Sequence, residues 1–319
     1  VMTKLEEPLP LGYCNVGRVI EVGKLVTDFK SGDRVVSNGY HAEIVAVSEK
    51  LCAKIPENVK DEEAVFTVLG SIGLQGIRLA EPTIGEVFVV SGLGLIGLLT
   101  AQILISGGVK VIGLDPDIKK QELANSFGIK TFSPTEFENI QDHLFKETSG
   151  NGVDGVIVTA ATKSSDPIHL AAEICRQRGR IILVGVTGLN LNRELFYKKE
   201  IRFQVSCSYG PGRYDPSYEI ESKDYPLGFV RWTEQRNFQA ILNLISDNKL
   251  ITNSLITNNY DFEDILKAYE TLLQNKFCLG IVINYKSSQS ARKRIIKINN
   301  NVKISKINSE IPNISFVGA

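Results

Sequence analysis

The sequence of 319 residues lacks closely spaced cysteines: its five cysteines are scattered, no two form a CxxC pair, and only three histidines accompany them. It therefore offers no disulfide or zinc-finger framework, and a cytoplasmic location is expected. No run of 18 apolar residues occurs, and residues 1–8 lack the apolar core of a secretion signal, so neither membrane insertion nor secretion is expected. Net charge is also absent, since 36 basic residues face 36 acidic ones.

What remains is an ordinary globular composition, 43% hydrophobic and 23% charged, long enough for about two domains. The one local excess of charge lies in residues 286–313, where seven basic residues accompany a single acid, Glu310. This stretch is rich in Ser, Asn and Lys, which is typical of a linker. Because no aromatic residues interleave with the charges, we do not expect nucleic-acid binding.

Between residues 86 and 207, short β-branched runs alternate with helical patterns, which predicts βαβ units around a parallel sheet. The fold class is therefore α/β, with a doubly wound parallel sheet. The predicted strands are Val87–Val90, Val109–Leu114, one near Thr131, Val156–Thr159, Ile181–Val184 and Ile201–Val205, and the predicted helices include Leu95–Ser106, Lys119–Phe127 and Pro167–Arg178.

The flanking segments have a different pattern. Residues 12–55 place glycines between short apolar runs, which suits a small antiparallel barrel with strands at Arg18–Val22, Arg34–Val36 and Glu43–Val47. The C-terminal part is expected to pack back on this barrel. It contains a predicted helix at Asn237–Ile245, a strand near Leu255, a helix at Phe262–Leu273 and a strand at Leu279–Tyr285.

The strongest motif is Gly-x-Gly-x-x-Gly, made by Gly92, Gly94 and Gly97 with Leu95 and Ile96 between the last two. It follows a predicted strand and opens a predicted helix, which is the context that dinucleotide binding requires. The first glycine permits a tight turn, the second lets a pyrophosphate approach the backbone, and the third allows close helix packing. The N–H groups at the helix start are then positioned to bind phosphate.

The next predicted strand ends at Asp115, eighteen residues beyond Gly97. Its carboxylate would accept hydrogen bonds from the adenosine ribose and repel a 2′-phosphate, so the sequence favours NAD over NADP. Lys119 and Lys120 leave NADP as an alternative, and a glycine turn that binds nothing is the other alternative.

With its flanks, the motif resembles the medium-chain dehydrogenase/reductase family, in which a GroES-like barrel precedes a dinucleotide-binding domain. The resemblance rests on residues 8–23, 28–35, 41–45, 61–70 and 260–285. It implies that Thr159, Val184 and Gly185 line the cofactor site and that Thr67 lies near the nicotinamide.

The chain departs from the zinc enzymes that it resembles. Those enzymes have Gly-His-Glu where this chain has Gly-Tyr-Cys at 12–14, a metal ligand where Thr67 stands, and closely spaced cysteines that are missing between Asn38 and Ala42. A catalytic zinc needs about three protein ligands, so Cys14 alone does not suffice. We therefore expect a site without metal.

Without a Lewis acid, the reaction needs a proton donor. Tyr13 stands at the former ligand position, and Tyr209 and Tyr214 are further candidates; for each, the alternative is a half-buried ring with a purely structural role. Tyr13, Thr67 and Tyr209 are the predicted catalytic residues. His41 is expected to be an ordinary barrel-loop histidine.

Residues 209–236 are dense in Tyr, Arg and Trp. Arginine binds phosphate or carboxylate in a bidentate manner, and aromatic rings suit sugars or bases, so this segment favours a polar small-molecule substrate. The predicted substrate residues are Arg213, Tyr214, Arg231 and Trp232. The alternative is an interdomain or subunit contact made by the same residue types.

The same segment resembles bacterial two-module oxidoreductases, in which a metal-free dehydrogenase module precedes a Gfo/Idh/MocA-like Rossmann module. The resemblance implies sugar or sugar-nucleotide chemistry in polysaccharide metabolism. Residues 314–319 look like the first strand of that second module, and the chain starts inside the barrel signature, so we expect a fragment with an incomplete barrel.

The expected domains are a GroES-like domain (1–61 with 232–285), a Rossmann domain (62–231), a linker (286–313) and the start of a second Rossmann domain (314–319). Three functions remain open: a zinc-independent NAD(H)-dependent oxidoreductase, a zinc-type alcohol or polyol dehydrogenase, and a catalytically silent NAD-binding partner of the second module. A homo-oligomer is compatible with each of them.

Overall fold

The computed structural model describes residues 11–275 and 277–285. The predicted linker (286–313), the predicted start of a second module (314–319) and the first ten residues lie outside the described residues. The described residues up to Asn284 belong to one compact unit, so the proposed boundaries between a barrel domain and a Rossmann domain stay predictions.

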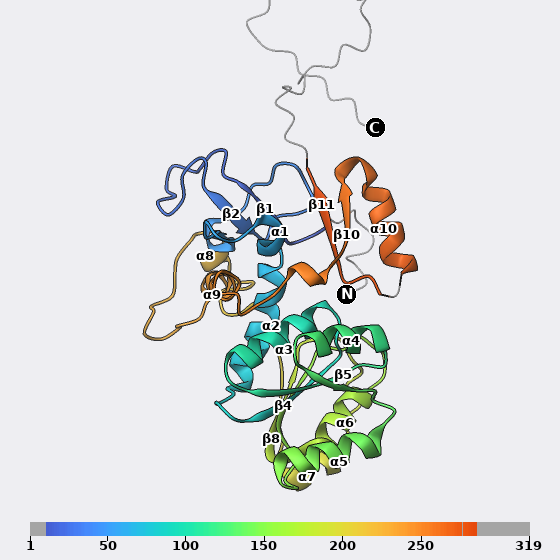
Figure 1. Ribbon diagram of the computed structural model, residues 1–319. Helices are drawn as coiled ribbons and strands as arrows, with labels where there is room; N and C mark the ends of the chain where they lie inside the picture. The colour runs from blue at the N-terminus through green and yellow to red at the C-terminus, as the bar shows by residue number, and fades with distance from the viewer. Residues whose placement is uncertain (1–10, 276, 286–319) are drawn as a thin grey trace, which may run out of the picture. The chain divides into compact units, whose positions relative to one another are not determined.

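A six-stranded, wholly parallel sheet forms the centre of the fold (Figure 1) and confirms the predicted fold class. Numbered along the chain, its strands follow the order 3-2-1-4-5-6, which is the doubly wound arrangement with a switch point between the first and fourth strands. In sheet order the strands are β6 (Lys130–Phe132), β5 (Lys110–Leu114), β4 (Val87–Ser91), β7 (Val153–Val158), β8 (Cys175–Leu183) and β9 (Arg202–Val205).

Helices cover both faces of this sheet (Figure 1), because successive strand residues point to opposite sides. In β4, Phe88 and Val90 belong to one buried cluster, while Val87 and Val89 belong to the other. The α-helices of the described residues, including those outside the central sheet, are α1 (Asp61–Ala64), α2 (Thr67–Ala80), α3 (Leu95–Ser106), α4 (Ile118–Ser126), α5 (Phe137–Thr148), α6 (Asp166–Ile174), α7 (Arg193–Lys199), α8 (Pro216–Glu219), α9 (Glu234–Ser246) and α10 (Ile265–Gln274).

Two smaller sheets flank the central one in sequence. The N-terminal sheet is antiparallel and contains β1 (Asn15–Arg18), β2 (Arg34–Ser37) and β3 (Cys52–Lys54). The C-terminal sheet pairs β10 (Ile256–Asp261) with β11 (Gly280–Asn284) in parallel. Within the described residues no strand pairing joins these two sheets into a closed barrel. Short 3₁₀ turns η2 (Glu49–Leu51), η3 (Asn253–Leu255) and η4 (Phe262–Asp264) precede β3, β10 and α10.

The barrel segment contains the main errors of the predicted elements. Residues 43–47 form no strand, and the predicted strand at 18–22 is displaced to Asn15–Arg18. The strand Cys52–Lys54 was not predicted. Short strands with few apolar residues depend on their partners across the sheet, so local pattern places them poorly.

A second error concerns the predicted helix at 167–178, because α6 ends at Ile174 and β8 starts at Cys175. Contacts with residues far away in the chain make this segment a strand. Arg176 Nε donates to Asp154 Oδ1 at 2.7 Å, and Arg180 donates to the carbonyls of Ala80 and Glu81 at 3.0 and 2.9 Å, which fixes this segment as an extended strand.

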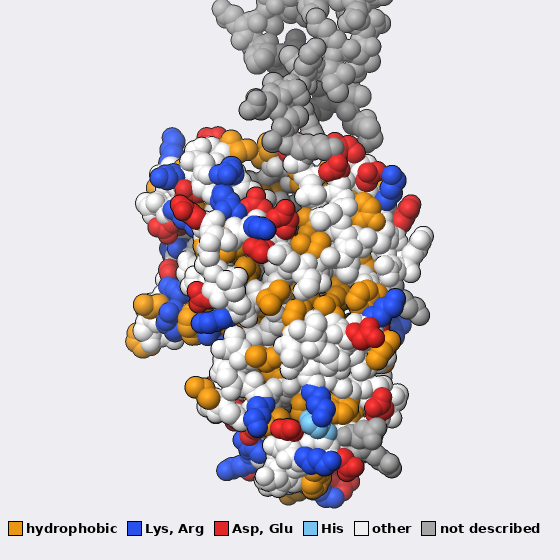
Figure 2. All heavy atoms as spheres, in the orientation of Figure 1, with side chains coloured by type: hydrophobic (Ala, Val, Ile, Leu, Met, Phe, Trp, Pro, Cys, Tyr) orange, Lys and Arg blue, Asp and Glu red, His pale blue; other side chains and the backbone are white. Residues whose placement is uncertain are grey.

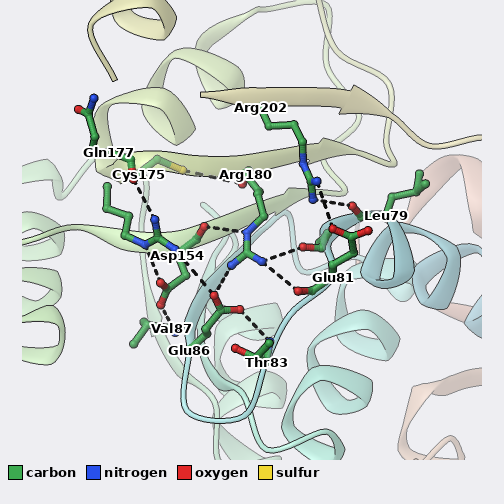
Figure 3. A network of polar contacts seen from close by, with 12 residues as sticks. Leu79, Glu81, Thr83, Glu86, Val87, Asp154, Cys175, Gln177, Arg180 and Arg202 are labelled. Carbon is green, nitrogen blue, oxygen red and sulfur yellow. Dashed lines mark hydrogen bonds and ion pairs between the residues drawn. The ribbon is translucent and has the colours of Figure 1, made fainter. Parts of the chain in front are cut away.

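These arginines belong to a network of polar contacts at the amino edge of the sheet (Figure 3). Arg180 also donates to Glu86, which immediately precedes β4, and Asp154 accepts from the N–H of Val87 at 2.8 Å. The network therefore ties the end of α2 to the starts of β4 and β7. It lies at the opposite edge from the glycine turn, which follows the last residue of β4.

On the face drawn in Figure 2, basic and acidic side chains are interspersed, in keeping with the zero net charge of the sequence. None of the helices formed by the described residues is long and apolar enough to cross a membrane.

Candidate functional site

The glycine turn joins β4 to α3 at the carboxyl edge of the sheet. Gly92 has a φ of +100°, and a Cβ there would lie 2.6 Å from the backbone nitrogen of Ala160. A Cβ on Gly97 would lie 1.9 Å from the carbonyl oxygen of Gly92. Both positions therefore require glycine for the fold of the turn itself.

Gly94 differs, because a Cβ at this position would meet no atom within 4 Å. Gly94 is the N-cap of α3, and it supplies no side chain to satisfy the first N–H groups of the helix. Leu95 and Ile96 are the first two residues of that helix, so their N–H groups have no carbonyl one turn earlier. The open space thus adjoins the unpaired donors and the positive end of the helix dipole, where phosphate binds well.

Asp115 lies directly beyond β5 and is almost completely buried. Its Oδ2 accepts the N–H of Leu93, inside the glycine turn, at 2.7 Å, and its Oδ1 accepts the N–H of Asp117 at 2.9 Å. The carboxylate therefore holds the turn in shape. A carboxylate offers about four acceptor positions, so it can accept further hydrogen bonds from a ribose.

The two lysines considered for NADP lie differently. Lys120 Nζ is 4.0 Å from Asp115 Oδ2, whereas Lys119 Nζ lies 5.8 Å from the centre of the Phe277 ring. Lys120, rather than the predicted Lys119, therefore stands beside the carboxylate.

The neighbouring strand ends complete the carboxyl edge. Thr159 follows β7, and its hydroxyl donates to the carbonyl of Gly92 at 2.6 Å. Val184 and Gly185 follow β8, and a Cβ on Gly185 would lie 2.2 Å from the carbonyl oxygen of Ala160. The structure thus brings the predicted cofactor residues of β4, β7 and β8 together around the switch point.

Tyr13 and Thr67 both lie near the start of α2, because Cys14 contacts the backbone of Leu69. Helix α2 has its C-terminal end bound to Arg180 at the amino edge, so its first residue, Thr67, points toward the carboxyl edge. Thr67 itself is fully buried, and its hydroxyl donates to the carbonyl of Ala64 at 2.6 Å. Tyr13 has 47% of its surface exposed, and partial burial, with a smaller effect of the neighbouring Cys14, raises the pKa of its phenol.

Cys14 packs at the start of α2, where the backbone N–H of Leu69 interacts with its sulfur. Burial raises the pKa of the Cys14 thiol to about 12. A zinc ligand must be a thiolate, and the adjacent Tyr13 and Thr67 are not zinc ligands. The donor set of the described residues does not fit a catalytic zinc: nowhere in 11–275 or 277–285 do three His, Cys, Asp or Glu side chains converge to hold a metal.

Tyr209 lies deeper than Tyr13, with 3% of its surface exposed. Its hydroxyl accepts a hydrogen bond from Asn38, its ring packs 5.3 Å from that of Phe238, and burial raises the pKa of its phenol strongly. This environment suits a structural link between the N-terminal sheet and α9 better than proton transfer to a substrate.

The four predicted substrate residues separate into two places. Arg213 donates to Glu219 at 2.5 Å and stacks on the ring of Tyr214, which is 68% exposed. Arg231 stacks on Trp232 instead, and Trp232 contacts Arg78 at the end of α2. Arg213 and Tyr214 therefore lie beside Tyr209, whereas Arg231 and Trp232 lie beside the C-terminal end of α2.

Two features escaped sequence reasoning. His41 Nδ1 lies 2.9 Å from the hydroxyl of Tyr269 in α10, and burial lowers the pKa of this histidine. Glu234 is fully buried with neither carboxylate oxygen hydrogen bonded. The partners of His41 and Tyr209 are 228 and 171 positions away in the chain, so no local pattern marks them.

The family model that matches this chain, two of its sequence relatives and one similar solved structure are all described as dehydrogenases. A family model described as zinc-binding dehydrogenase matches residues 96–221. Sorbitol dehydrogenase 2 of Saccharomyces cerevisiae is 27% identical over 305 residues, covering 83% of this chain and 78% of that protein. D-guloside 3-dehydrogenase of Escherichia coli is 28% identical over 269 residues, covering 81% and 72%.

Among solved structures, galactitol-1-phosphate dehydrogenase from Escherichia coli superimposes with a TM-score of 0.71 at 22% identity, covering 84% of this chain and 82% of that one. At 22% identity the similarity shows a shared fold only. The matched part is 84% of this chain, which is more than the central sheet and the helices that cover it, so the shared fold includes flanking segments as well.

Proposed function

Because the chain belongs to the zinc-type medium-chain dehydrogenase/reductase family, we propose that it is an NAD(H)-dependent oxidoreductase that interconverts a hydroxyl and a carbonyl on a polyol or sugar. The observation that carries the proposal is the glycine turn. Three features of this turn support a dinucleotide site: the backbone crowding at Gly92 and Gly97, the open space at Gly94, and the carboxylate of Asp115 bound to the turn at Leu93.

The residues that would hold the dinucleotide follow from this geometry. The N–H groups of Leu95 and Ile96 would bind the pyrophosphate, and Asp115 would bind the adenosine ribose. Thr159, Val184 and Gly185 would line the remainder of the cofactor site. We propose NAD over NADP, because a 2′-phosphate would meet the buried carboxylate of Asp115; Lys120, at 4.0 Å, offsets part of that repulsion.

The substrate class is proposed from the relatives and from the arginine-rich segment. The named relatives act on sorbitol and on a D-guloside, which are a polyol and a glycoside. In this chain the exposed ring of Tyr214 lies beside Arg213, and an exposed aromatic ring suits a sugar; Arg213 itself is paired with Glu219. A sugar nucleotide is the finer form of the proposal.

We further propose that the reaction proceeds without zinc and that Tyr13 transfers the proton. The bound dinucleotide would supply or accept the hydride. In the direction of carbonyl reduction, the proton would pass from the Tyr13 hydroxyl to the carbonyl oxygen, and water would return a proton to the phenolate. A raised phenol pKa keeps Tyr13 protonated, so it favours the role of donor over that of base.

The alternative is a zinc-type polyol dehydrogenase, which is favoured by the family model and by the relatives themselves. A catalytically silent NAD-binding module is the third candidate. The decisive experiment measures NADH formation with sorbitol, xylitol, glycosides and sugar nucleotides, before and after dialysis against a chelator, together with the metal content of the protein.

Turnover that survives removal of all zinc supports the proposal. Turnover that disappears with the metal and returns with added zinc supports the alternative. Tight NAD binding without turnover on any polyol, glycoside or sugar nucleotide supports the silent module. Failure to bind NAD or NADP would overturn all three.

A further inference from the structure

Trp232, the sole tryptophan of the sequence, is stacked between two arginines. The guanidinium carbon of Arg78 lies 3.5 Å from the ring, and that of Arg231 lies 3.9 Å from it. Two guanidinium groups this close to one ring cannot share a face, so they occupy opposite faces of the indole. The arrangement joins the last turn of α2 to the residues just before α9.

Neither arginine has an acidic partner among the described residues. Arg78 Nε donates to Asn237 Oδ1 at 2.7 Å, and Arg231 makes no hydrogen bond or ion pair in this part of the chain. Other arginines of the segment are neutralised: Arg236 contacts Asp224 at 2.5 Å. The two stacked guanidiniums therefore leave a local positive charge uncompensated, and burial, with the repulsion from Arg231, lowers the pKa of Arg78 to about 10.

Arg78 and Trp232 also form part of the wall of a cavity of about 520 Å³. The one acidic residue in its wall, Glu81, contacts Arg202 at 3.2 Å and so does not neutralise Arg78 (Figure 3 shows Glu81 and Arg202). The rest of the wall is mostly apolar and includes Leu74, Ile77, Pro82, Ile103, Leu104, Val109 and Leu244.

We propose that this cavity is a binding site for an organic anion, whose phosphate or carboxylate group is held by Arg78 and whose apolar or planar body lies against the aliphatic wall. Arg231 does not line the cavity, but its positive charge on the other face of Trp232 adds to the attraction. Arginine forks bind such groups in a bidentate manner, and an anion beside Arg78 offsets the repulsion between Arg78 and Arg231. The size of the cavity suits a small organic molecule.

The site is separate from the one proposed for the dinucleotide. Its wall includes Ser106 and Gly107, at the C-terminal end of α3, whereas the glycine turn lies at the start of the same helix. Twelve helical residues span roughly 16 Å along the axis. An anion in the cavity therefore has no contact with the turn, and this inference does not depend on the proposed function.

The single tryptophan supplies the assay, because its emission reports on Trp232 alone. We would titrate the whole chain with phenyl phosphate, inorganic phosphate and phenol at constant ionic strength. We expect saturable quenching by phenyl phosphate, weaker binding of inorganic phosphate and no saturable response to phenol. Saturating NAD should leave the phenyl phosphate affinity unchanged.

Substitution of Arg231, which is exposed, should not affect folding. R231Q should weaken phenyl phosphate binding only roughly two- to fivefold, because it removes a nearby positive charge that does not touch the anion. R78K, which keeps the charge but loses the planar fork, should weaken it on the order of tenfold or more, the loss expected for one charged hydrogen bond. R193Q is the matched control, because Arg193 is an exposed arginine stacked on Tyr197 elsewhere, at 4.3 Å.

Three outcomes would overturn the inference: no saturable binding of phenyl phosphate at millimolar concentration, a weakening by R78K no larger than that by R193Q, or competition by NAD. Equal affinities for inorganic and phenyl phosphate would overturn the assignment of the apolar wall. Thermal melts of each variant distinguish lost binding from lost folding.

Discussion

Asp115 combines a structural and a binding role, and its substitution tests both. D115A should weaken NAD binding by about 1.5–3 kcal/mol, because it removes charged hydrogen bonds to the ribose and releases the N–H of Leu93. NADP binding should fall less, since the repulsion of its 2′-phosphate is removed as well. Calorimetric titration with both cofactors measures the difference.

The matched control for D115A is D117A, two residues away. Asp117 caps α4 by accepting the N–H of Lys119 at 2.9 Å, so its loss should cost about 1 kcal/mol of stability and leave the NAD/NADP ratio unchanged. Equal losses for NAD and NADP in D115A would contradict the proposed ribose contact.

Tyr13 and Tyr209 provide a second comparison between matched residues. Y13F should lower the rate of carbonyl reduction by about 10²-fold or more, because it removes the proposed proton donor, and should leave NAD affinity intact. Y209F should lower stability by about 1 kcal/mol through the lost contact with Asn38, with little change in rate. Steady-state kinetics and thermal melts measure both effects; the reverse result would assign proton transfer to Tyr209.

The buried carboxyl group of Glu234 should make the stability of the protein depend on pH. Burial, with a smaller contribution from Glu219, raises the pKa of this carboxyl from 4.5 to about 8. The folded state therefore binds the proton more tightly than the unfolded state, so stability falls as the pH rises from about 4.5 and levels off above about 8.

E234Q should remove this dependence, because an amide does not titrate. Chemical denaturation at pH 5 and pH 8 should show the variant gaining stability relative to the wild type at pH 8, on the order of 1–3 kcal/mol. E194Q is the control, since Glu194 is exposed in an ion pair with Lys198 and its pKa is lowered, so it should show no change between these two pH values. A parallel pH profile for E234Q and wild type would rule out the assigned role.

At the scale of elements, the turn between β4 and α3 allows the fold and the cofactor site to be separated. G97A should destabilise the protein by several kcal/mol, because its methyl group would lie 1.9 Å from the carbonyl oxygen of Gly92. G94A should fold normally, since its methyl group meets no protein atom within 4 Å, yet should lose NAD affinity at least about tenfold by occupying the space proposed for the pyrophosphate.

Thermal melts and NAD titration of the two variants are the measurement. If G94A binds NAD as well as the wild type, the pyrophosphate does not approach the backbone at Gly94, and the proposed cofactor position is wrong. The pair is informative because both changes add one methyl group within the same six-residue turn.

In the molecule as a whole, the amino edge and the carboxyl edge of the central sheet have different roles: the first stabilises the fold, and the second is the proposed cofactor site. The amino-edge network (Figure 3) joins α2, β4, β7 and β8 through the partly buried Arg176 and Arg180, at the opposite edge of the sheet from the glycine turn. R180Q should lower the free energy of unfolding by about 3–5 kcal/mol, because it leaves the largely buried carboxylate of Glu86 without its main partner. Unfolding should remain a single transition, as expected for one compact unit.

NAD affinity in R180Q, measured below the melting temperature, should match that of the wild type. A loss of affinity without a loss of stability would indicate that the amino-edge network shapes the cofactor site at a distance.

The parallel sheet, most of its strands and the glycine turn could be predicted from local sequence patterns. Each of these has a local signature: continuous β-branched runs mark buried strands, and glycines at fixed spacing mark a turn in which the backbone needs room. The observed helix Leu95–Ser106 matches the prediction residue for residue, because its apolar run is bounded by glycines on both sides.

Features that depend on partners far away in the chain could not be predicted in this way. Ion pairs to Asp154 and Glu86 turn residues 175–180 into a strand, and packing separates Arg231 and Trp232 from Arg213. The pairs His41–Tyr269 and Asn38–Tyr209 likewise form between residues far apart in the chain. The periodicity of a sequence predicts which side chains of a helix or strand are buried. It does not predict which distant residues they contact, because those contacts form only when the elements pack together.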